Sequence, residues 1–208
     1  MKQVYIHGLG QTPASWEKTI SYLENDKQIL CPDLAEIIGG REVTYQNLYE
    51  AFSEVCDEID GPIDLCGLSL GGVLALSYAV NHPKKINSLV LIAAQYKMPK
   101  KLLRFQNALF RFMPKSTFQQ TGFEKKQFIQ LCETMMELDL SESINKISCP
   151  ALVVCGNRDR ANKKASMDLA GILEHADIEI VEGSGHEINI DAPEKLAKVL
   201  QAFYDRIA

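Results

Sequence analysis

The stretch LCGLSLGG, residues 65–72, decides the fold predicted for this chain of 208 residues. An apolar run ends there, and a segment rich in Ala and Leu follows. Gly67, Ser69 and Gly71 give the pattern G-x-S-x-G, in which a serine occupies a sharp turn between a strand and a helix. Glycines two residues to either side let the strand and the helix approach closely, which leaves the hydroxyl exposed beside a helix N-terminus. We therefore predict that Ser69 is a nucleophile; the alternative is a tight turn without chemistry.

Short runs of β-branched residues alternate with helical patterns on both sides of this turn. We expect strands at residues 3–8, 27–34, 62–67, 86–94, 149–157 and 177–183. We expect helices at residues 12–24, 44–60, 70–81, 161–174 and after 191, with Thr12 and Asp191 as N-caps of the first and last. This alternation predicts an α/β fold: a mostly parallel sheet of about six strands with helices on both faces.

The alternation lapses over residues 95–148, where helical patterns dominate. We interpret this segment as a small helical cap, or lid, inserted into a core formed by residues 1–94 and 149–208. In folds of this class ligands bind at the carboxyl ends of the strands, so we expect the insertion to lie over that edge.

A serine hydroxyl is inert at neutral pH unless a base activates it, and four histidines are present. His7 ends the first predicted strand, His82 lies at a helix end, and His175 is expected to face solvent. His186 lies in EGSGHEIN, residues 182–189, where glycines allow the loop to fold over neighbouring strand ends. We predict that His186 is the base.

The base needs an acid that orients it, and a strand end is the expected position. Asp159 ends the stretch VVCGNRD, residues 153–159, just after a predicted strand. Its alternative role is the N-cap of the following helix. Asp33, in CPDL, precedes the serine and is interpreted as a loop cap. We predict a catalytic triad of Ser69, His186 and Asp159.

The order of these three residues, together with HGLGQ (residues 7–11) and GLSLGG (residues 67–72), resembles the α/β-hydrolase superfamily. The resemblance covers about residues 3–94 and 149–207. It implies a serine esterase-like enzyme, a cap at the inserted segment, and an oxyanion hole made by the backbone N–H groups of Leu9 and Leu70. Members usually begin with two antiparallel strands before the HG strand, so we expect a minimal version of the fold.

The predicted cap is strongly basic. Residues 97–126 contain eight Lys and Arg residues but one acid, Glu124, for a net charge of +7. Within them, KKLLRFQNALFRFM (residues 100–113) puts four apolar side chains on one helical stripe: Leu102, Phe105, Leu109 and Phe112. We favour a lid helix that packs this stripe over the pocket, so Phe105, Leu109 and Phe112 are candidate substrate contacts. Two alternatives are electrostatic steering of anionic substrates and reversible contact with an anionic membrane surface.

Composition narrows the function classes. The net charge of −5 argues against nucleic-acid binding. No Cys pair has C-x-x-C spacing, so we interpret the six cysteines as buried, reduced thiols and predict no metal. The glycine-rich loop lacks the G-K-[ST] of a phosphate-binding loop, and we predict no cofactor.

The N-terminal apolar run is too short for a signal peptide, and no run approaches the length of a membrane span. We therefore expect a cytoplasmic protein without stable membrane association, whose partner is a small-molecule ester.

The leading function is hydrolysis of a small carboxylic ester through an acyl-enzyme. The same triad also serves C–C bond hydrolysis, thioester hydrolysis and lyase steps, and the sequence leaves these open. A dehalogenase is disfavoured, because that branch of the superfamily carries aspartate at the serine position. A third possibility is a ligand-sensing module with slow turnover. Substrate identity, acyl chain length and oligomeric state stay undetermined at this point.

Overall fold

The computed structural model describes residues 2–24, 28–118 and 122–207, apart from the side chain of Leu102. Within these residues six strands form one sheet in the order β2-β1-β3-β4-β5-β6, and every neighbouring pair is parallel. The strands are β1 (Lys2–Ile6), β2 (Gln28–Leu30), β3 (Ile63–Leu68), β4 (Ile86–Ile92), β5 (Ala151–Gly156) and β6 (Ala176–Val181). The predicted α/β class and parallel sheet are confirmed.

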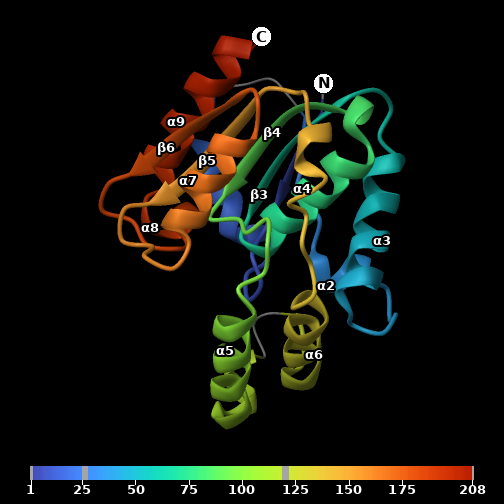
Figure 1. Cartoon of the computed structure of the whole chain (residues 1–208). Coiled ribbons are helices and arrows are strands. Elements are labelled where there is room, and N and C mark those ends of the chain that lie inside the picture. Colours follow the sequence, from blue (N-terminus) through green and yellow to red (C-terminus); the bar gives the residue numbers. More distant parts are fainter. Residues whose placement is uncertain (1, 25–27, 119–121, 208) are drawn as a thin grey trace.

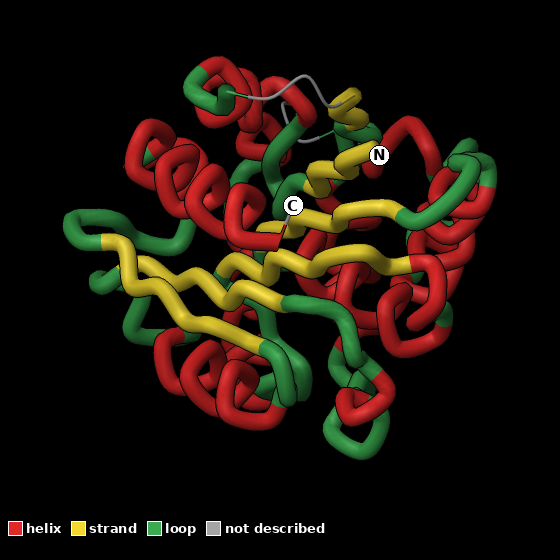
Figure 2. The backbone as a smooth tube through the Cα atoms, turned by 90° about the horizontal axis from the view of Figure 1, so that it is seen from above, coloured by secondary structure: helices red, strands yellow, loops and turns green. Residues whose placement is uncertain are grey.

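Helices cover both faces of the sheet (Figure 1 and Figure 2). The α-helices are α1 (Glu17–Ser21), α2 (Leu34–Ile37), α3 (Tyr45–Asp57), α4 (Leu70–Asn81), α5 (Lys100–Phe112), α6 (Lys125–Met135), α7 (Lys163–Ile172), α8 (Ile188–Asp191) and α9 (Pro193–Ile207). Short 3-10 helices are η1 (Pro13–Trp16), η2 (Pro83–Lys85), η3 (Lys115–Phe118) and η4 (Ile144–Lys146).

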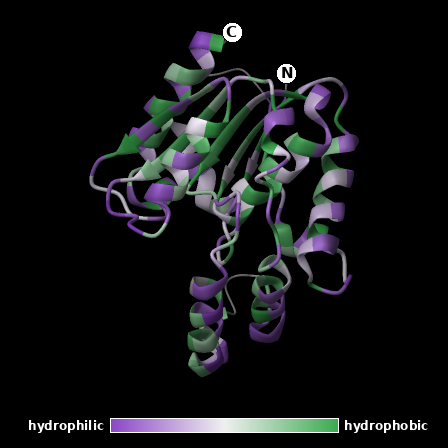
Figure 3. Ribbon diagram, in the orientation of Figure 1, coloured by the Kyte–Doolittle hydropathy of each residue, from purple (hydrophilic) through white to green (hydrophobic). Residues whose placement is uncertain are grey.

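The core has two layers, one on each face of the sheet. Side chains of α3, α4 and α7 pack on one face, and Trp16 and the apolar side of α9 pack on the other. The central strand β3 is buried along its whole length, and β4 nearly so. This explains why both strands are mainly apolar, because each faces helices on both sides (Figure 3).

The strand order reverses between β1 and β3. The chain leaves β1 toward β2 at one edge, then returns to β3 on the other side of β1. A crevice forms at the carboxyl ends of strands where the order reverses, and such crevices bind ligands. Leu9 follows β1 and Ser69 follows β3. The fold therefore brings these two loops together at one point of the sheet edge.

We call residues 95–148 the cap segment. Its helices α5 and α6 project beyond the carboxyl edge of the sheet (Figure 1). An isolated antiparallel bridge between Lys97 and Asp139 joins the two ends of the segment. Its division from the core as a separate inserted unit stays our interpretation.

Two local predictions near the N-terminus differ from the structure, and a third is confirmed. The helix expected over residues 12–24 is η1 followed by the short α1, and Thr12 precedes η1 without a side-chain capping bond. The second strand ends at Leu30, and residue 27 of its predicted range lies outside the described residues. Asp33 does cap α2, since its carboxylate accepts from the amides of Ala35 and Glu36.

Asp191 is not the N-cap of the last helix. It ends α8, and its carboxylate accepts a hydrogen bond from the Gly185 amide at 2.7 Å. The helix α9 begins at Pro193 instead. The acid therefore fastens the loop that carries His186 rather than the start of α9.

Candidate active site

Ser69 occupies a strained turn between β3 and α4. Its φ of 53° and ψ of −113° lie in a region that residues with a side chain rarely adopt. Ser69 and Ala93 are the two non-glycine residues with positive φ among those described, and both line the same cavity. Strain concentrated at a cavity wall is typical of functional sites.

Close backbone contacts explain the glycines around this turn. A Cβ atom on Gly67 would lie 2.3 Å from the carbonyl oxygen of Gly71. A Cβ atom on Gly71 would lie 2.2 Å from the carbonyl oxygen of Ile6, at the end of β1. The Ser69 amide donates to the Ile92 carbonyl at 2.8 Å, which ties the turn to β4. The local prediction for residues 67–71 therefore has a direct steric basis.

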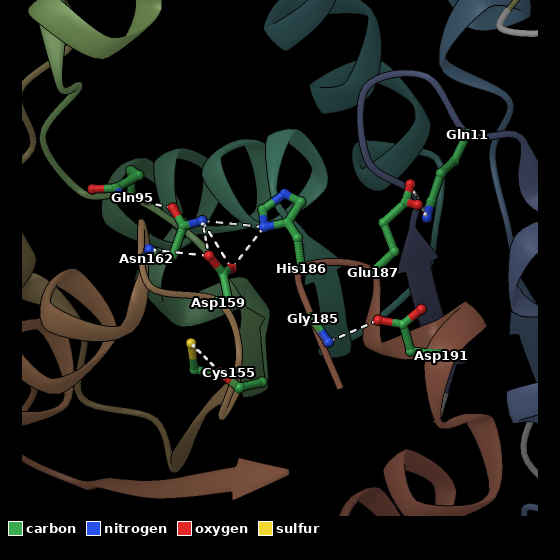
Figure 4. A network of polar contacts seen from close by, with 10 residues as sticks. Gln11, Gln95, Cys155, Asp159, Asn162, Gly185, His186, Glu187 and Asp191 are labelled. Carbon is green, nitrogen blue, oxygen red and sulfur yellow. Dashed lines mark hydrogen bonds and ion pairs between the residues drawn. The ribbon is translucent and has the colours of Figure 1, made fainter. Parts of the chain in front are cut away.

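His186 and Asp159 lie within hydrogen-bonding distance. The distance from His186 Nδ1 to Asp159 Oδ2 is 2.8 Å, and the two side chains point toward one another in Figure 4. The Asp159 side chain is 4% exposed, whereas that of His186 is 41% exposed. The loop that carries His186 can reach this position because Gly156 has no side chain. A Cβ atom on Gly156 would lie only 2.1 Å from the Gly185 carbonyl oxygen.

Asn162 belongs to the same network, and sequence reasoning missed it. Its Nδ2 donates to Asp159 Oδ1 at 2.9 Å and to Oδ2 at 2.8 Å, and its Oδ1 accepts from Gln95 Nε2 at 2.7 Å (Figure 4). Its backbone amide also donates to Asp159 Oδ1. The signal was available as Asn three residues after the candidate acid, in a turn that opens a helix.

These donors set the charge of Asp159. Burial raises the pKa of its carboxyl, but hydrogen bonds from His186 and Asn162 outweigh burial, and the pKa is lowered from its ordinary value. An ionised carboxylate is an acceptor, so His186 Nδ1 carries the proton that points at Asp159. The other ring nitrogen, Nε2, is then free to accept a proton.

His7 is a structural histidine. Its Nδ1 lies 2.9 Å from the Gly8 carbonyl oxygen, and its Nε2 accepts from the Leu34 amide at 3.1 Å. Burial lowers the pKa of its imidazole, which favours the neutral ring that these contacts need. His82 ends α4 and stacks on Tyr78, and His175 is exposed, as predicted.

A cavity of about 490 Å³ opens between the sheet edge and the cap segment. Ser69, Asp159 and His186 all line it. Among the described residues no hydrogen bond joins the Ser69 hydroxyl to the His186 ring, and apo structures often show such contacts loosened. The remaining lining is mainly apolar and includes Leu9, Leu70, Val73, Met98, Leu103, Phe105, Leu109, Phe128 and Met135.

The three cap residues predicted as substrate contacts have different environments in the structure. Phe105 and Leu109 line the cavity, whereas Phe112 does not and is 89% exposed. Leu102, the fourth residue of the predicted stripe, has a side chain outside the described part of the chain. The stripe is therefore not simply packed over the pocket as we expected.

Leu9 and Leu70, the two residues predicted to form the oxyanion hole, both line the cavity. Leu70 is the first residue of α4, so its N–H has no intrahelical acceptor. Leu9 lies in a turn that is closed by the Gln11 amide donating to the Gly8 carbonyl at 3.1 Å. Their role as an oxyanion hole stays a prediction.

The cavity wall also contains a cysteine side chain. Cys132 lines the cavity, but burial raises the pKa of its thiol to about 12, so it is not a thiolate nucleophile at neutral pH. All six cysteines are free in the structure. Over the described ranges no group of three or more His, Cys, Asp or Glu side chains could hold a metal ion.

The described part of the chain contains no helix with the length and apolarity that a membrane span requires. The cytoplasmic location stays a prediction.

Similar proteins of known structure share this architecture. An enol-lactonase from Burkholderia xenovorans LB400 superimposes with a TM-score of 0.85 at 18% identity, covering 98% of this chain and 91% of that one. An esterase from Thermogutta terrifontis superimposes with a TM-score of 0.82 at 18% identity, covering 100% of this chain and 90% of that one. At such identities the likeness concerns the fold.

Sequence comparison gives the family. A monoacylglycerol lipase of Xenopus laevis, abhd6-B, is 24% identical over 95% of this chain and 73% of its own length. The sequence profile described as "Alpha/beta hydrolase family" matches residues 3–199, which is nearly the whole chain. This protein therefore belongs to the α/β-hydrolase family.

Proposed function

We propose that this protein is a serine hydrolase that cleaves a small carboxylic ester through an acyl-enzyme intermediate. Ser69 is the nucleophile, His186 the general base and Asp159 the acid that orients it. The observation that carries the proposal is the 2.8 Å contact between His186 and a buried Asp159 at the cavity that a strained Ser69 also lines. A strained serine beside an oriented imidazole is the arrangement that acyl transfer requires.

The first half-reaction forms the acyl-enzyme. His186 Nε2 takes the proton of Ser69 Oγ while the oxygen attacks the acyl carbon. The amides of Leu9 and Leu70 donate hydrogen bonds to the oxygen that becomes negative, and the α4 N-terminus favours that charge. His186 then gives its proton to the departing alcohol oxygen as the C–O bond breaks.

Water completes the cycle. His186 takes a proton from a water molecule whose oxygen attacks the acyl carbon, and the returned proton releases Ser69 as the acid product leaves. Through both halves the Asp159 carboxylate stabilises the imidazolium and stays ionised. Its lowered pKa supports this role, because a carboxylate that protonated readily would not hold the ring.

The cavity supports an apolar acyl group as substrate. Its volume of about 490 Å³ lies in the range of small-molecule sites, and its walls are mostly aliphatic and aromatic side chains. Two similar proteins are named a monoacylglycerol lipase and an enol-lactonase, which supports an ester-type bond.

Activity-based labelling tests the proposal. A fluorophosphonate probe should modify Ser69 Oγ with loss of fluoride, and the modified peptide is identified by mass spectrometry. Ser69→Ala should abolish labelling and lower kcat on p-nitrophenyl esters by about 10⁴–10⁶-fold. Ser21→Ala, an exposed serine whose hydroxyl bonds the Lys18 carbonyl, is the matched control and should retain both.

Two outcomes would contradict it. Near-normal turnover by Ser69→Ala would remove the nucleophile assignment. Labelling of the wild type without turnover of any ester or thioester in a chain-length panel would instead favour a ligand-sensing module.

A further inference from the structure

The helix α5 has two apolar faces, and one of them is packed against the rest of the cap. Phe110 contacts Phe118 and Phe128, with ring centroids 6.0 and 5.0 Å apart. Asn107, on the same face, is buried and donates to the Ile129 carbonyl of α6. This face accounts for the position of α5 beside α6.

The other face carries large apolar side chains that the fold leaves in water. Phe105 is 63% exposed, Leu109 is 50% exposed and Phe112 is 89% exposed. Their spacing of four and three residues puts them on one side of the helix, and we call them the outer stripe. Folding alone does not require this exposure. A row of aromatic and aliphatic side chains left in water marks an interaction site.

Basic residues border the outer stripe. Lys101 lies one turn before Phe105, and Arg104 lies three residues after Lys101 on the same flank; both are exposed. Lys115 and Lys126, on neighbouring elements, are exposed as well. Within the described ranges none of these four forms a close ion pair with a carboxylate, although Arg104, after Lys100, helps to lower the pKa of the Glu137 carboxyl. By contrast, the cap's other basic groups include three that are paired: Lys97 with Asp139, Lys100 with Glu137 and Arg111 with Glu133.

We propose that the outer stripe of α5 docks onto the surface of an anionic lipid bilayer. Phe105, Leu109 and Phe112 would enter the boundary between headgroups and acyl chains, and Lys101 and Arg104 would contact anionic headgroups. The helix projects beyond the sheet edge (Figure 1), so this surface is reachable without rearrangement of the core.

The charge distribution favours a bilayer over a second copy of the chain. The cap segment, residues 95–148, carries a net charge of +4 while the whole chain carries −5, so an anionic surface attracts the cap and repels the rest. A symmetric dimer through the outer stripe would bring the same Lys and Arg residues of two copies together, because a two-fold contact pairs identical patches.

Docking would place the cavity at the membrane. Phe105 and Leu109 belong to both the outer stripe and the cavity wall. An ester with a lipid tail would then pass from the bilayer to the cavity without crossing water. This last consequence depends on the proposed function, whereas docking itself does not.

Vesicle sedimentation tests the docking of the full chain. We expect binding to phosphatidylcholine vesicles containing about one-third phosphatidylglycerol, at least tenfold tighter than to phosphatidylcholine alone and weakened by added NaCl. Phe112→Ser, and separately Lys101→Glu with Arg104→Glu, should each weaken binding by about tenfold or more. Turnover of a water-soluble ester by Phe112→Ser should be unchanged, since Phe112 lies outside the cavity.

Matched controls lie at the opposite edge of the sheet. Ile172, the last residue of α7, is 44% exposed, and Lys84 in η2 precedes β4. Ile172→Ser and Lys84→Glu should bind vesicles as the wild type does. Equal binding by all variants, or no preference for anionic vesicles, would overturn the proposal. The proposal would also be overturned if the wild type did not bind vesicles and instead formed a dimer that Phe112→Ser dissociates.

The Ser69→Ala variant separates this proposal from the function. It should bind vesicles like the wild type while it loses turnover. If it kept turnover and still bound, the proposed function would fail and docking would stand. If it lost turnover and the wild type did not bind, docking would fail and the proposed function would stand.

Discussion

The reactive edge of the core and the helix α5 of the cap are built by different rules. At the edge, backbone meets backbone so closely that Gly67, Gly71 and Gly156 have no room for a Cβ atom. On α5, by contrast, Phe105 and Phe112 are largely exposed. The first region allows almost no freedom at its turns, and the second presents unpaired apolar surface.

This difference assigns separate tasks to the two regions. Tight backbone packing fixes the positions of Ser69 and of the His186 imidazole. Acyl transfer tolerates displacements of only a fraction of an ångström in such groups. A helix that touches the rest through one face can change its other face without disturbing that geometry. We infer that the core sets the reaction and the cap sets which substrate reaches it.

Gly156→Ala is the substitution with the largest expected effect on this comparison. The added methyl group would meet the Gly185 carbonyl oxygen at 2.1 Å, so the loop that carries His186 must move. We expect kcat/KM on a small ester to fall by about 10²-fold or more, because small misplacements of catalytic groups are costly. Steady-state kinetics and urea unfolding of the same preparation measure the two effects.

Gly171→Ala is its control, since a Cβ atom there has no neighbour within 4 Å. This change should leave kinetics intact and stabilise α7 by about 0.5–1 kcal/mol. If Gly156→Ala kept wild-type kinetics, the close backbone contact would have no catalytic importance.

The elbow around Ser69 was predictable because its sequence pattern is local. Five residues contain both the strained position and the glycines that permit it, so the pattern is visible in the sequence even though the atom that Gly71 must clear belongs to Ile6 on β1. The assignment of Asp159 and His186 needed in addition that strand ends meet at one sheet edge, which parallel topology guarantees.

Other features depended on contacts between distant residues. The place of Asn162 beside Asp159 follows from a local spacing, but its bond with Gln95, 67 positions away, is indicated by no local pattern. Asp191 matched a helix cap by spacing, but the Gly185 amide competed for its carboxylate. On α5, periodicity identified which residues share a face, yet the stripe that packs contains Asn107 and Phe110 instead.

Phe105→Ala tests the role of the cap in substrate binding and should have an effect of intermediate size on KM. Phe105 lines the cavity, so its removal takes apolar surface from the acyl site. We expect KM for a medium-chain p-nitrophenyl ester to rise by about tenfold, with little change for the acetate. Phe112→Ala, outside the cavity, should change neither value on these soluble esters. A matching loss on the acetate would show that Phe105 supports the reactive geometry and would contradict the division of tasks.

Asn162→Ala should have the smallest effect, and its pH dependence distinguishes its role. Asp159 has a lowered pKa because hydrogen bonds from His186 and Asn162 outweigh burial, so its ionised form stabilises the fold. That contribution is present above the ordinary carboxyl pKa of 3.8 and is lost as pH falls through the lowered value.

Asn162→Ala removes two donors to the charged group, so the free energy of unfolding should drop by about 1–2 kcal/mol near pH 7. The gap should narrow as pH falls below 3.8, because Asp159 becomes protonated first in the unfolded chain and then, as pH passes the lowered pKa, in the folded chain as well. Urea unfolding across this range measures it, with the exposed Asn145→Ala as control. A gap that did not change with pH would mean that Asn162 supports packing rather than the charge of Asp159.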